Sequence, residues 1–230
     1  MLILGLDTST PMAGMGVVGL NGTLAELNIS FGTDYSEKLL ASIKYLLNSV
    51  NLSVNDLSGF SISIGPGSFT GLRIGLATIK GLAYASGKPV VAVPTLDAIA
   101  WQFGHSRYPV ASIIDAKKKE IYVALYEAKK NDIRRITPYL AMPPQGLPKI
   151  IKNKTLLVGP GVGVFKKELS NILKDKALFL TDGFSYISGE VVARIGLRKL
   201  LAGEIENIEK LEPLYVRESD AQLKSSKAKS

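Results

Sequence analysis

The sequence predicts an α/β protein made of two halves that each follow the order βββαβα. Apolar segments of strand length alternate with longer segments in which apolar residues recur at helical spacing. The first expected strand of each half ends in an aspartate, Asp7 and Asp115, and a Gly-Pro-Gly run follows a later strand in each half, at residues 65–67 and 159–161. Because these features recur in the same order, we interpret the chain as an internal duplication.

The first half contains the clearer local signals. Asn21-Gly22 separates two apolar runs and predicts a hairpin. Asp34 and Glu37 have the spacing of a capping box, which predicts a helix from about residue 34. A second helix is expected to follow the glycine-rich loop and to end at Gly87. The expected strands are residues 2–6, 14–19, 24–29, 60–64 and 89–93.

The second half repeats this order with weaker signals. A proline-rich link at residues 143–148 separates its hairpins from its next strand, and a helix is expected at residues 188–201. Residues 215–217 are expected to form a short strand near the C-terminus. The other expected strands are residues 110–114, 120–126, 133–140 and 155–158.

We expect two domains, residues 1–103 and residues 104–230. The first contains the glycine-rich loop and the two helices beside it, and Trp101 and Phe103 are interpreted as core residues near the hinge. The last helix of the second domain is expected to pack back on the first. Residues 221–230 are basic and low in apolar side chains, which predicts a disordered tail.

Two such halves that face one another form the actin and sugar-kinase (ASKHA) architecture. In that architecture the turns after Asp7 and Asp115 would face a shared cleft. Carboxylates and glycine turns at such a cleft handle Mg²⁺ and nucleotide phosphates, so both aspartates are candidates for a vestigial site of this kind. Capping of the adjoining turn is the alternative for each of them.

Composition excludes several kinds of site. The 230 residues contain no cysteine, so disulfides, thiolate metal sites and a cysteine nucleophile are impossible. A single histidine, His105, excludes a two-histidine metal site and an HExxH protease. The net charge of +8 is compatible with nucleic acid or an acidic partner, although the lysines look scattered and weighted to the tail.

The chain shows no targeting or membrane signal. The N-terminal apolar run lacks a basic region and is interrupted by Asp7, which argues against a signal peptide. No apolar stretch reaches the length of a membrane span. We therefore expect a cytoplasmic protein with no membrane partner.

The glycine-rich loop at residues 65–75 precedes a helix and offers free N–H groups together with the positive end of a helix dipole. This arrangement suits a phosphate, for which Gly65, Gly67, Ser68 and Thr70 are the candidate residues. The loop fits neither a Walker A motif nor a dinucleotide-binding fingerprint. A tight strand-to-helix connection, with Ser68 or Thr70 as a helix cap, remains the alternative.

Four segments together are similar to one known family. Residues 64–77, Ile-Gly-Pro-Gly-Ser-Phe-Thr-Gly-Leu-Arg-Ile-Gly-Leu-Ala, closely resemble the hallmark of the bacterial TsaB family of tRNA threonylcarbamoyladenosine (t6A) biosynthesis proteins. Residues 3–10, 114–126 and 213–220 resemble the opening strand, the second-domain hairpin and the C-terminal motif of that family. The resemblance extends in order over nearly the whole chain.

This resemblance implies a noncatalytic scaffold that binds TsaD, the paralogous subunit with paired metal-binding histidines. TsaD transfers threonylcarbamoyl to N6 of adenosine 37 in tRNAs that read ANN codons. The ATPase TsaE joins the complex, the scaffold forms a homodimer when alone, and tRNA is met through the complex. The resemblance implies no catalytic residue, no metal and no cofactor for the chain alone, with ATP or ADP and Mg²⁺ expected only in the assembled complex.

The helix from Tyr35 supports the noncatalytic role. It corresponds to the TsaD helix that carries the metal histidines, and it contains no histidine here. Members of the TsaB family often have histidine before the Ser36-Glu37 pair, so Tyr35 departs from the family pattern.

The resemblance also implies that two neighbouring helices form the surface for self-pairing and for TsaD. Arg73 lies in the first helical turn, where the dipole disfavours a cation, so we expect an acidic partner for it. A small-residue face is expected to contact the partner, so that Gly75→Arg would block pairing without unfolding the chain. Core packing is the alternative for most of these positions. The candidates are Tyr35, Glu37, Leu39, Gly71, Arg73, Gly75 and Thr78.

Two other functions stay open. An active ATPase or kinase of the same architecture would need Asp7 or Asp115 as a catalytic or Mg²⁺-binding carboxylate. A stand-alone RNA-binding protein would need a basic surface, preferably with exposed aromatic side chains.

Overall fold

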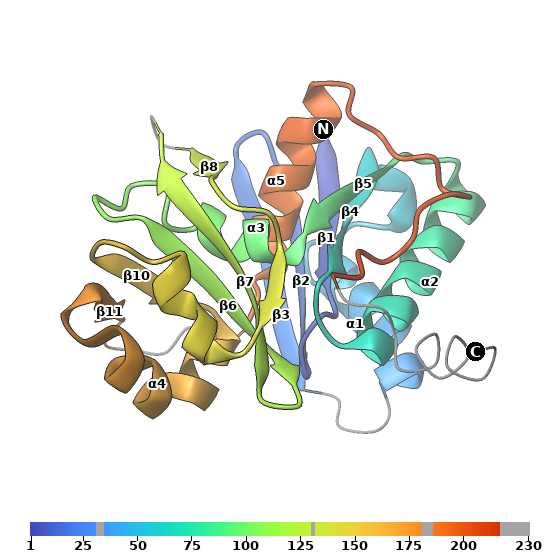
Figure 1. The fold of residues 1–230 in the computed structure, drawn as a ribbon. Coiled ribbons are helices and arrows are strands. Elements are labelled where there is room, and N and C mark those ends of the chain that lie inside the picture. The colour runs from blue at the N-terminus through green and yellow to red at the C-terminus, as the bar shows by residue number, and fades with distance from the viewer. Residues whose placement is uncertain (31–34, 130–131, 181–185, 217–230) are drawn as a thin grey trace.

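The computed structural model of the chain describes residues 1–30, 35–129, 132–180 and 186–216, and it is built on two sheets (Figure 1). The first sheet has the order β3-β2-β1-β4-β5, in which β1 pairs antiparallel with β2 and parallel with β4. The predicted hairpin at Asn21-Gly22 joins β2 to β3. The strands are β1 (Leu2–Asp7), β2 (Met12–Gly19), β3 (Gly22–Ser30), β4 (Gly59–Gly65) and β5 (Val90–Pro94).

The second sheet repeats this arrangement. Its order is β11-β10-β6-β7-β8, with β9 also paired to β7, so that β6 takes the place of β1 and β10 the place of β4. The predicted duplication of strand order is therefore confirmed. The strands are β6 (Val110–Lys117), β7 (Glu120–Ala128), β8 (Ile133–Arg135), β9 (Leu140–Met142), β10 (Thr155–Val158) and β11 (Ala177–Phe179).

Helices cover the sheets. The longest, α2, follows the glycine-rich loop and ends at Gly87, which has the left-handed conformation expected of a helix cap. In the second half a short 3₁₀ helix, η2 (Pro144–Lys149), stands where α1 stands in the first. The α-helices are α1 (Tyr35–Ser49), α2 (Phe69–Ser86), α3 (Thr95–Trp101), α4 (Pro160–Leu173) and α5 (Gly189–Leu201), and the other 3₁₀ helices are η1 (Val54–Asp56) and η3 (Lys174–Lys176).

Several sequence-based expectations were wrong or incomplete. The strand expected at residues 133–140 is two strands, because Pro138 has no N–H to pair and the Thr137 hydroxyl accepts the Leu125 N–H at 2.9 Å. Helix α3 and strand β11 were not predicted, and α4 was implied by the duplication without predicted bounds. Tyr215 and Val216 form no strand, and Arg217 and the capping residue Asp34 lie outside the described residues.

The first sheet is buried on both faces. On one face its strands pack against α1 and α2, which places Leu4 and Ile62 in a core with Ile79. On the other face Ile3 and Val18 pack against Ala193 and Leu197 of α5. The helix that ends the second half thus covers the sheet of the first half (Figure 1).

Helix α5 approaches the first sheet closely at its N-terminus. A Cβ atom on Gly189 would lie 2.2 Å from Cα of Met15 in β2, so only glycine permits this spacing. Backbone therefore packs directly on backbone where the two halves meet.

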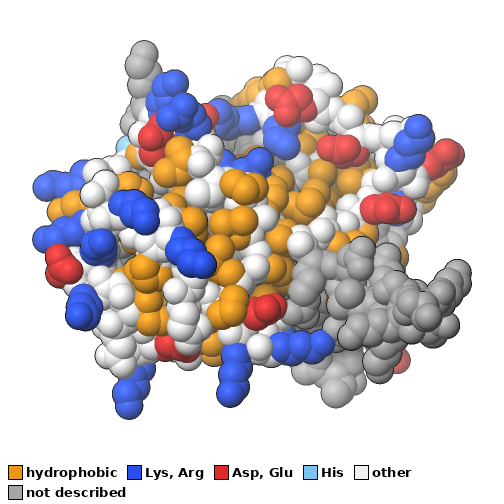
Figure 2. All heavy atoms as spheres, in the orientation of Figure 1, with side chains coloured by type: hydrophobic (Ala, Val, Ile, Leu, Met, Phe, Trp, Pro, Cys, Tyr) orange, Lys and Arg blue, Asp and Glu red, His pale blue; other side chains and the backbone are white. Residues whose placement is uncertain are grey.

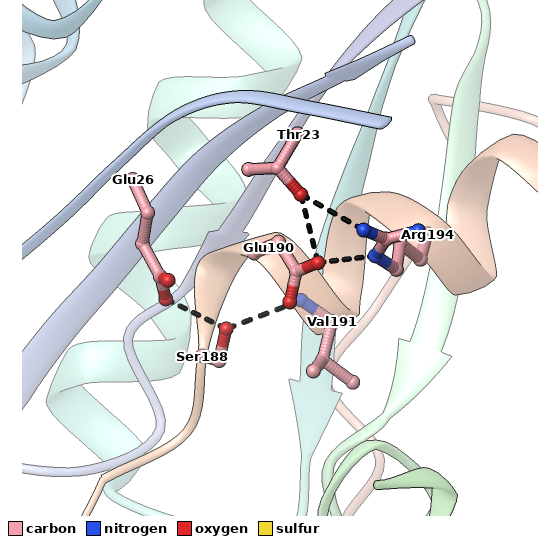
Figure 3. A network of polar contacts seen from close by, with 6 residues as sticks. All are labelled: Thr23, Glu26, Ser188, Glu190, Val191 and Arg194. Carbon is pink, nitrogen blue, oxygen red and sulfur yellow. Dashed lines mark hydrogen bonds and ion pairs between the residues drawn. The ribbon is translucent and has the colours of Figure 1, made fainter. Parts of the chain in front are cut away.

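Polar contacts tie the same end of α5 to the edge strand β3 (Figure 3). The hydroxyl of Ser188 accepts the N–H of Val191 at 3.2 Å as a helix cap and donates to Glu26 at 2.6 Å. The Thr23 hydroxyl donates to Glu190 at 2.8 Å, and Arg194 pairs with Glu190 and donates to Thr23 at 3.0 Å. These contacts fix the position of α5 on the first sheet.

Within the described ranges, no helix has both the length and the apolar character needed to cross a membrane.

Candidate functional site

A cleft of about 730 Å³ lies between the two halves, and mostly apolar side chains line it. Helices α2 and α4 begin at its edge, as the duplication predicts. Apolar side chains also extend across the centre of the face shown in Figure 2. The first half contributes Ser9, Thr10, Pro11, Pro66, Gly67, Ser68, Phe69 and Leu72; the second contributes Ile114, Asp115, Ala116, Lys117, Lys118, Tyr122, Pro160 and Val164; and Leu214, Tyr215 and Val216 complete the lining.

The glycine-rich loop is a strand-to-helix connection held to the first hairpin. Gly65 has a φ of 114°, a conformation that favours glycine. The Ser68 N–H donates to the Ser9 carbonyl at 2.7 Å, and the Ser68 hydroxyl accepts the Gly71 N–H at 3.2 Å. Ser68 is therefore the helix cap that the alternative interpretation predicted, and Thr70 is exposed beside it. The Ser68 side chain is already engaged within the chain.

The small-residue face of α2 faces the protein interior. A Cβ atom on Gly71 would lie 2.1 Å from the Thr8 carbonyl oxygen, and one on Gly75 would lie 2.1 Å from the Thr8 hydroxyl. Both glycines are buried, so the expectation that they form an open contact surface was wrong. The related expectation that Gly75→Arg would spare the fold was also wrong, because the arginine would have to displace Thr8.

The remaining interface candidates are divided between core and surface. Leu39 is fully buried in the first core, where it cannot contact another chain. Glu37 is exposed, and Thr78 is half-buried with its hydroxyl donating to the Ile74 carbonyl at 2.9 Å. The side chain of Tyr35 lies outside the described residues.

The turn after Asp7 lines the cleft as expected, through Ser9, Thr10 and Pro11, but Asp7 itself is fully buried and is not part of the lining. Its carboxylate accepts the Ser9 hydroxyl at 2.8 Å and the Ser9 N–H at 3.2 Å. Burial raises the pKa of Asp7 to about 6, although the neighbouring hydroxyls of Ser63 and Ser9 and the Ser9 N–H lower it. Asp7 is thus a turn-capping carboxyl in the interior.

Asp115 lines the cleft and is partly exposed. Its carboxylate accepts the Lys117 N–H at 2.7 Å and pairs with the Lys117 ammonium at 2.8 Å. It therefore caps the turn that Lys117, Lys118 and Lys119 form with left-handed backbone angles. The two equivalent aspartates cap equivalent turns, but only the second meets the cleft.

We expect Asp7→Asn to change how stability depends on pH. Because the pKa of Asp7 is about 6 in the folded chain and 3.8 ordinarily, protonated Asp7 stabilises the fold at low pH, and this stability is lost as the pH rises to about 6. The shift corresponds to about 3 kcal/mol. Measured by urea denaturation, the unfolding free energy of the natural chain minus that of Asp7→Asn should fall by about this amount between about pH 4 and pH 7. A difference that stays constant over this range would contradict the burial effect.

Arg73 contacts aromatic side chains of its own chain, which the sequence did not reveal. Its guanidinium lies 3.8 Å from the centroid of the Phe69 ring, and its Nε donates to the Tyr215 hydroxyl at 3.3 Å. The Phe69 and Tyr215 rings are 5.4 Å apart. In the part of the chain that the structure describes, no carboxylate pairs with Arg73, so the expected acidic partner is not found there.

Residues 206–216, which follow α5, hold this aromatic cluster in place. The Leu214 N–H donates to the Ile64 carbonyl at 2.7 Å, and the Glu206 N–H donates to the Val90 carbonyl at 2.9 Å. The segment after α5 therefore returns along the first sheet and closes one wall of the cleft. No pairing of Arg73 with a tyrosine 142 positions away can be inferred from local sequence.

A second surface lies on α1 and α2, on the side away from the sheet. Leu40 is 53% exposed, Tyr45 67% and Tyr84 64%, and the Tyr84 hydroxyl donates to Glu209 at 3.4 Å. An apolar groove of about 630 Å³ lies between α1, η1 and α2, and Leu40 lines it together with Glu37 and Lys44. Most residues of this surface differ from the expected interface candidates.

The side chains offer little for a metal. Among the described residues, no group of three or more histidine, aspartate or glutamate side chains is placed to hold an ion. At the cleft, the acidic candidate Asp115 is already paired with Lys117.

The fold and site define a class of protein. Two duplicated α/β halves, with strand-to-helix turns on opposite sides of a shared cleft, make this an actin-like protein of the ASKHA architecture.

The family model of TsaD, tRNA N6-adenosine threonylcarbamoyltransferase, matches residues 31–225, and the chain belongs to that family.

Individual relatives show which proteins of this family the chain is similar to. The chain is 26% identical to the tRNA threonylcarbamoyladenosine biosynthesis protein TsaB of Bacillus subtilis, over 97% of each chain. It is 26% identical to the TsaB protein of Escherichia coli, over 96% of each chain. Among solved structures, YeaZ from Pseudomonas aeruginosa superposes with a TM-score of 0.79 at 24% identity, over 93% of this chain and 99% of that one. The resemblance to TsaB proteins is confirmed over nearly the full length.

Proposed function

We propose that this chain takes part in t6A biosynthesis as a noncatalytic subunit that binds and activates TsaD. Relatives that carry the name of this pathway match it nearly end to end. The observation that carries the binding role is the apolar groove between α1, η1 and α2, where Leu40 lines the groove and is 53% exposed. In this proposal TsaD covers that surface in the complex, and a second copy of the chain covers it when TsaD is absent.

The polar side chains at and below the cleft support a noncatalytic role. Of the two aspartates in equivalent positions, Asp7 is buried under the cleft and Asp115 is paired with Lys117. Ser68, the hydroxyl best placed on the loop, caps α2. In this proposal the chain alone binds no nucleotide or metal, TsaE joins the complex, and ATP or ADP and Mg²⁺ are bound only there. The protein acts in the cytoplasm, where its tRNA is met through the complex.

Leu40→Asp is expected to weaken the binding of TsaD by about 30-fold, because a carboxylate would be buried at the centre of the proposed interface. The measurement is the affinity for TsaD by calorimetry, together with in vitro t6A formation by TsaD, TsaE and the threonylcarbamoyl-adenylate synthase. Without this chain, or with Leu40→Asp at low concentration, little modified tRNA should form. The matched control is Leu20→Asp, because Leu20 is 66% exposed on the turn between β2 and β3.

If Leu40→Asp and Leu20→Asp lost the same affinity for TsaD, the assignment of the α1 and α2 surface as the TsaD interface would be contradicted. Full t6A formation in the absence of the chain would contradict the activating role. ATP hydrolysis by the chain alone, abolished by Asp115→Asn, would instead establish the competing function of an actin-like ATPase with its site in the cleft.

A further inference from the structure

Positive charge is concentrated in the second half of the chain. Residues 1–103 contain 5 basic residues (lysine or arginine) and 6 acidic residues. Residues 104–203 contain 18 basic residues and 8 acidic residues. The net charges of these segments are −1 and +10, so the expectation of scattered, tail-weighted lysines was wrong. In Figure 2, basic side chains with few acidic ones among them cover the side formed by the second half.

The densest part of this charge lies on one continuous surface, which we call the lysine face. It is formed by the end of η2, the link that leads into β10, the outer side of α4 and η3. Residues 149–176 contain only two acidic side chains, Glu168 and Asp175. The lysine face consists of Lys149, Lys152, Lys154, Lys166, Lys167, Lys174 and Lys176.

Strand register and helix contacts bring these lysines together. Thr155 pairs with Ala177 in parallel strands, so the preceding residues, Lys154 and Lys176, lie at the same end of the sheet. Helix α4 ends beside them at Lys174. Element η2 packs on α4, where Gln145 donates to Glu168 at 2.5 Å. The lysines are therefore close in space as well as in sequence.

The charges of the lysine face are not neutralised. In the part of the chain that the structure describes, no carboxylate lies within salt-bridge distance of these seven ammonium groups. Six of the seven side chains are exposed, and Lys176 is half-buried. By contrast, Arg198 in the same half pairs with Asp132 at 2.7 Å and Arg134 pairs with Glu127 at 2.5 Å. Of the seven lysines, Lys152 donates to the Pro148 carbonyl at 3.1 Å and Lys166 lies 5.8 Å from the centroid of the Phe179 ring. Neither contact neutralises the positive charge.

We propose that the lysine face binds the phosphate backbone of RNA directly. Lysine presents a hydrated point charge on a flexible stem, which suits phosphates without requiring a fixed orientation. Lys167 and Lys174 are separated by roughly 10 Å along α4, so the face extends over several phosphates rather than one small anion. Residues 149–176 include no large aromatic side chain that is exposed, so binding is to the backbone and is independent of base sequence.

The choice of RNA rests on the proposed function, which brings the chain to tRNA. If the chain has that function, the lysine face is the surface through which this subunit itself binds the tRNA. It lies on the second half, whereas the proposed TsaD surface lies on α1 and α2 in the first. One chain can therefore contact both partners.

The test is fluorescence anisotropy of unmodified tRNA with the full chain at several salt concentrations. Replacement of Lys154, Lys174 and Lys176 by glutamine is expected to weaken binding by about tenfold or more and to reduce the slope of log K against log salt by about 2. The matched control replaces Lys38, Lys44 and Lys80 of the first half by glutamine, which removes the same charge and should leave binding within about twofold.

Equal weakening by both sets of changes would overturn the proposal, because net charge alone would then explain binding. So would displacement of tRNA by polyglutamate as readily as by polyuridylate, because the face would then fit an acidic protein. Binding to TsaD is measured in parallel. If the natural chain binds tRNA through the lysine face but does not bind TsaD, the proposed function fails while this inference stands.

Discussion

Gly189→Ala is expected to lower the free energy of unfolding by about 3 kcal/mol, the upper end of what overpacking usually costs. The added methyl would lie 2.2–2.3 Å from the backbone N, Cα and C atoms of Met15. Because these are backbone atoms, no side chain can rotate away, and α5 would have to move off the first sheet. Urea denaturation followed by circular dichroism measures the change.

Gly163→Ala is the matched control, because Gly163 lies in α4 and a Cβ atom there meets nothing within 4 Å. Alanine at this helical position should raise stability by about 0.5–1 kcal/mol. If Gly189→Ala were as stable as the natural chain, the close packing of α5 on β2 would be disproved.

Gly71→Ala is the second change with a large expected effect, a loss of about 2–3 kcal/mol in unfolding free energy. Its methyl would lie 2.1 Å from the Thr8 carbonyl oxygen, so the start of α2 would have to separate from the turn after β1. The Ser68–Ser9 backbone hydrogen bond at 2.7 Å should weaken with it. Hydrogen exchange of the Ser68 amide reports this local change directly.

Gly81→Ala provides the control within the same helix, because a Cβ atom at Gly81 meets no other atom within 4 Å. It should be neutral or slightly stabilising. Equal stability of the Gly71 and Gly81 variants would mean that the small-residue face of α2 does not contact Thr8 and is open to a partner after all.

The sequence predicted those parts of the fold that depend on local pattern. Apolar alternation, the Asn21-Gly22 turn and the cap at Gly87 each act over a few residues, and the structure contains the corresponding elements. The internal duplication predicted that the second half repeats the first, and the two sheets do share one arrangement of strands. Helix α3 was missed because its seven residues are too few to show a helical period, and β11 because three residues are too few for a pattern.

The candidate site was predicted less well because burial is decided by tertiary contacts. Periodicity placed Leu39, Gly71 and Gly75 on helices correctly, but it could not say which helix face meets the sheet. The glycines serve close approach to Thr8, which belongs to another segment of the chain. Likewise, Asp7 and Asp115 occupy equivalent turns, yet only the surroundings of each determine that one is buried and the other is not.

The position of α5 has a consequence for synthesis of the chain. Strand β5 ends at Pro94, but the helix that covers Ile3 and Val18 begins only at Gly189. A ribosome adds roughly 5–20 residues per second, so the first sheet emerges with one apolar face open for on the order of 5–20 seconds. During this interval the nascent first half has a surface suited to chaperones. The first sheet is covered on both faces only when α5 leaves the exit tunnel.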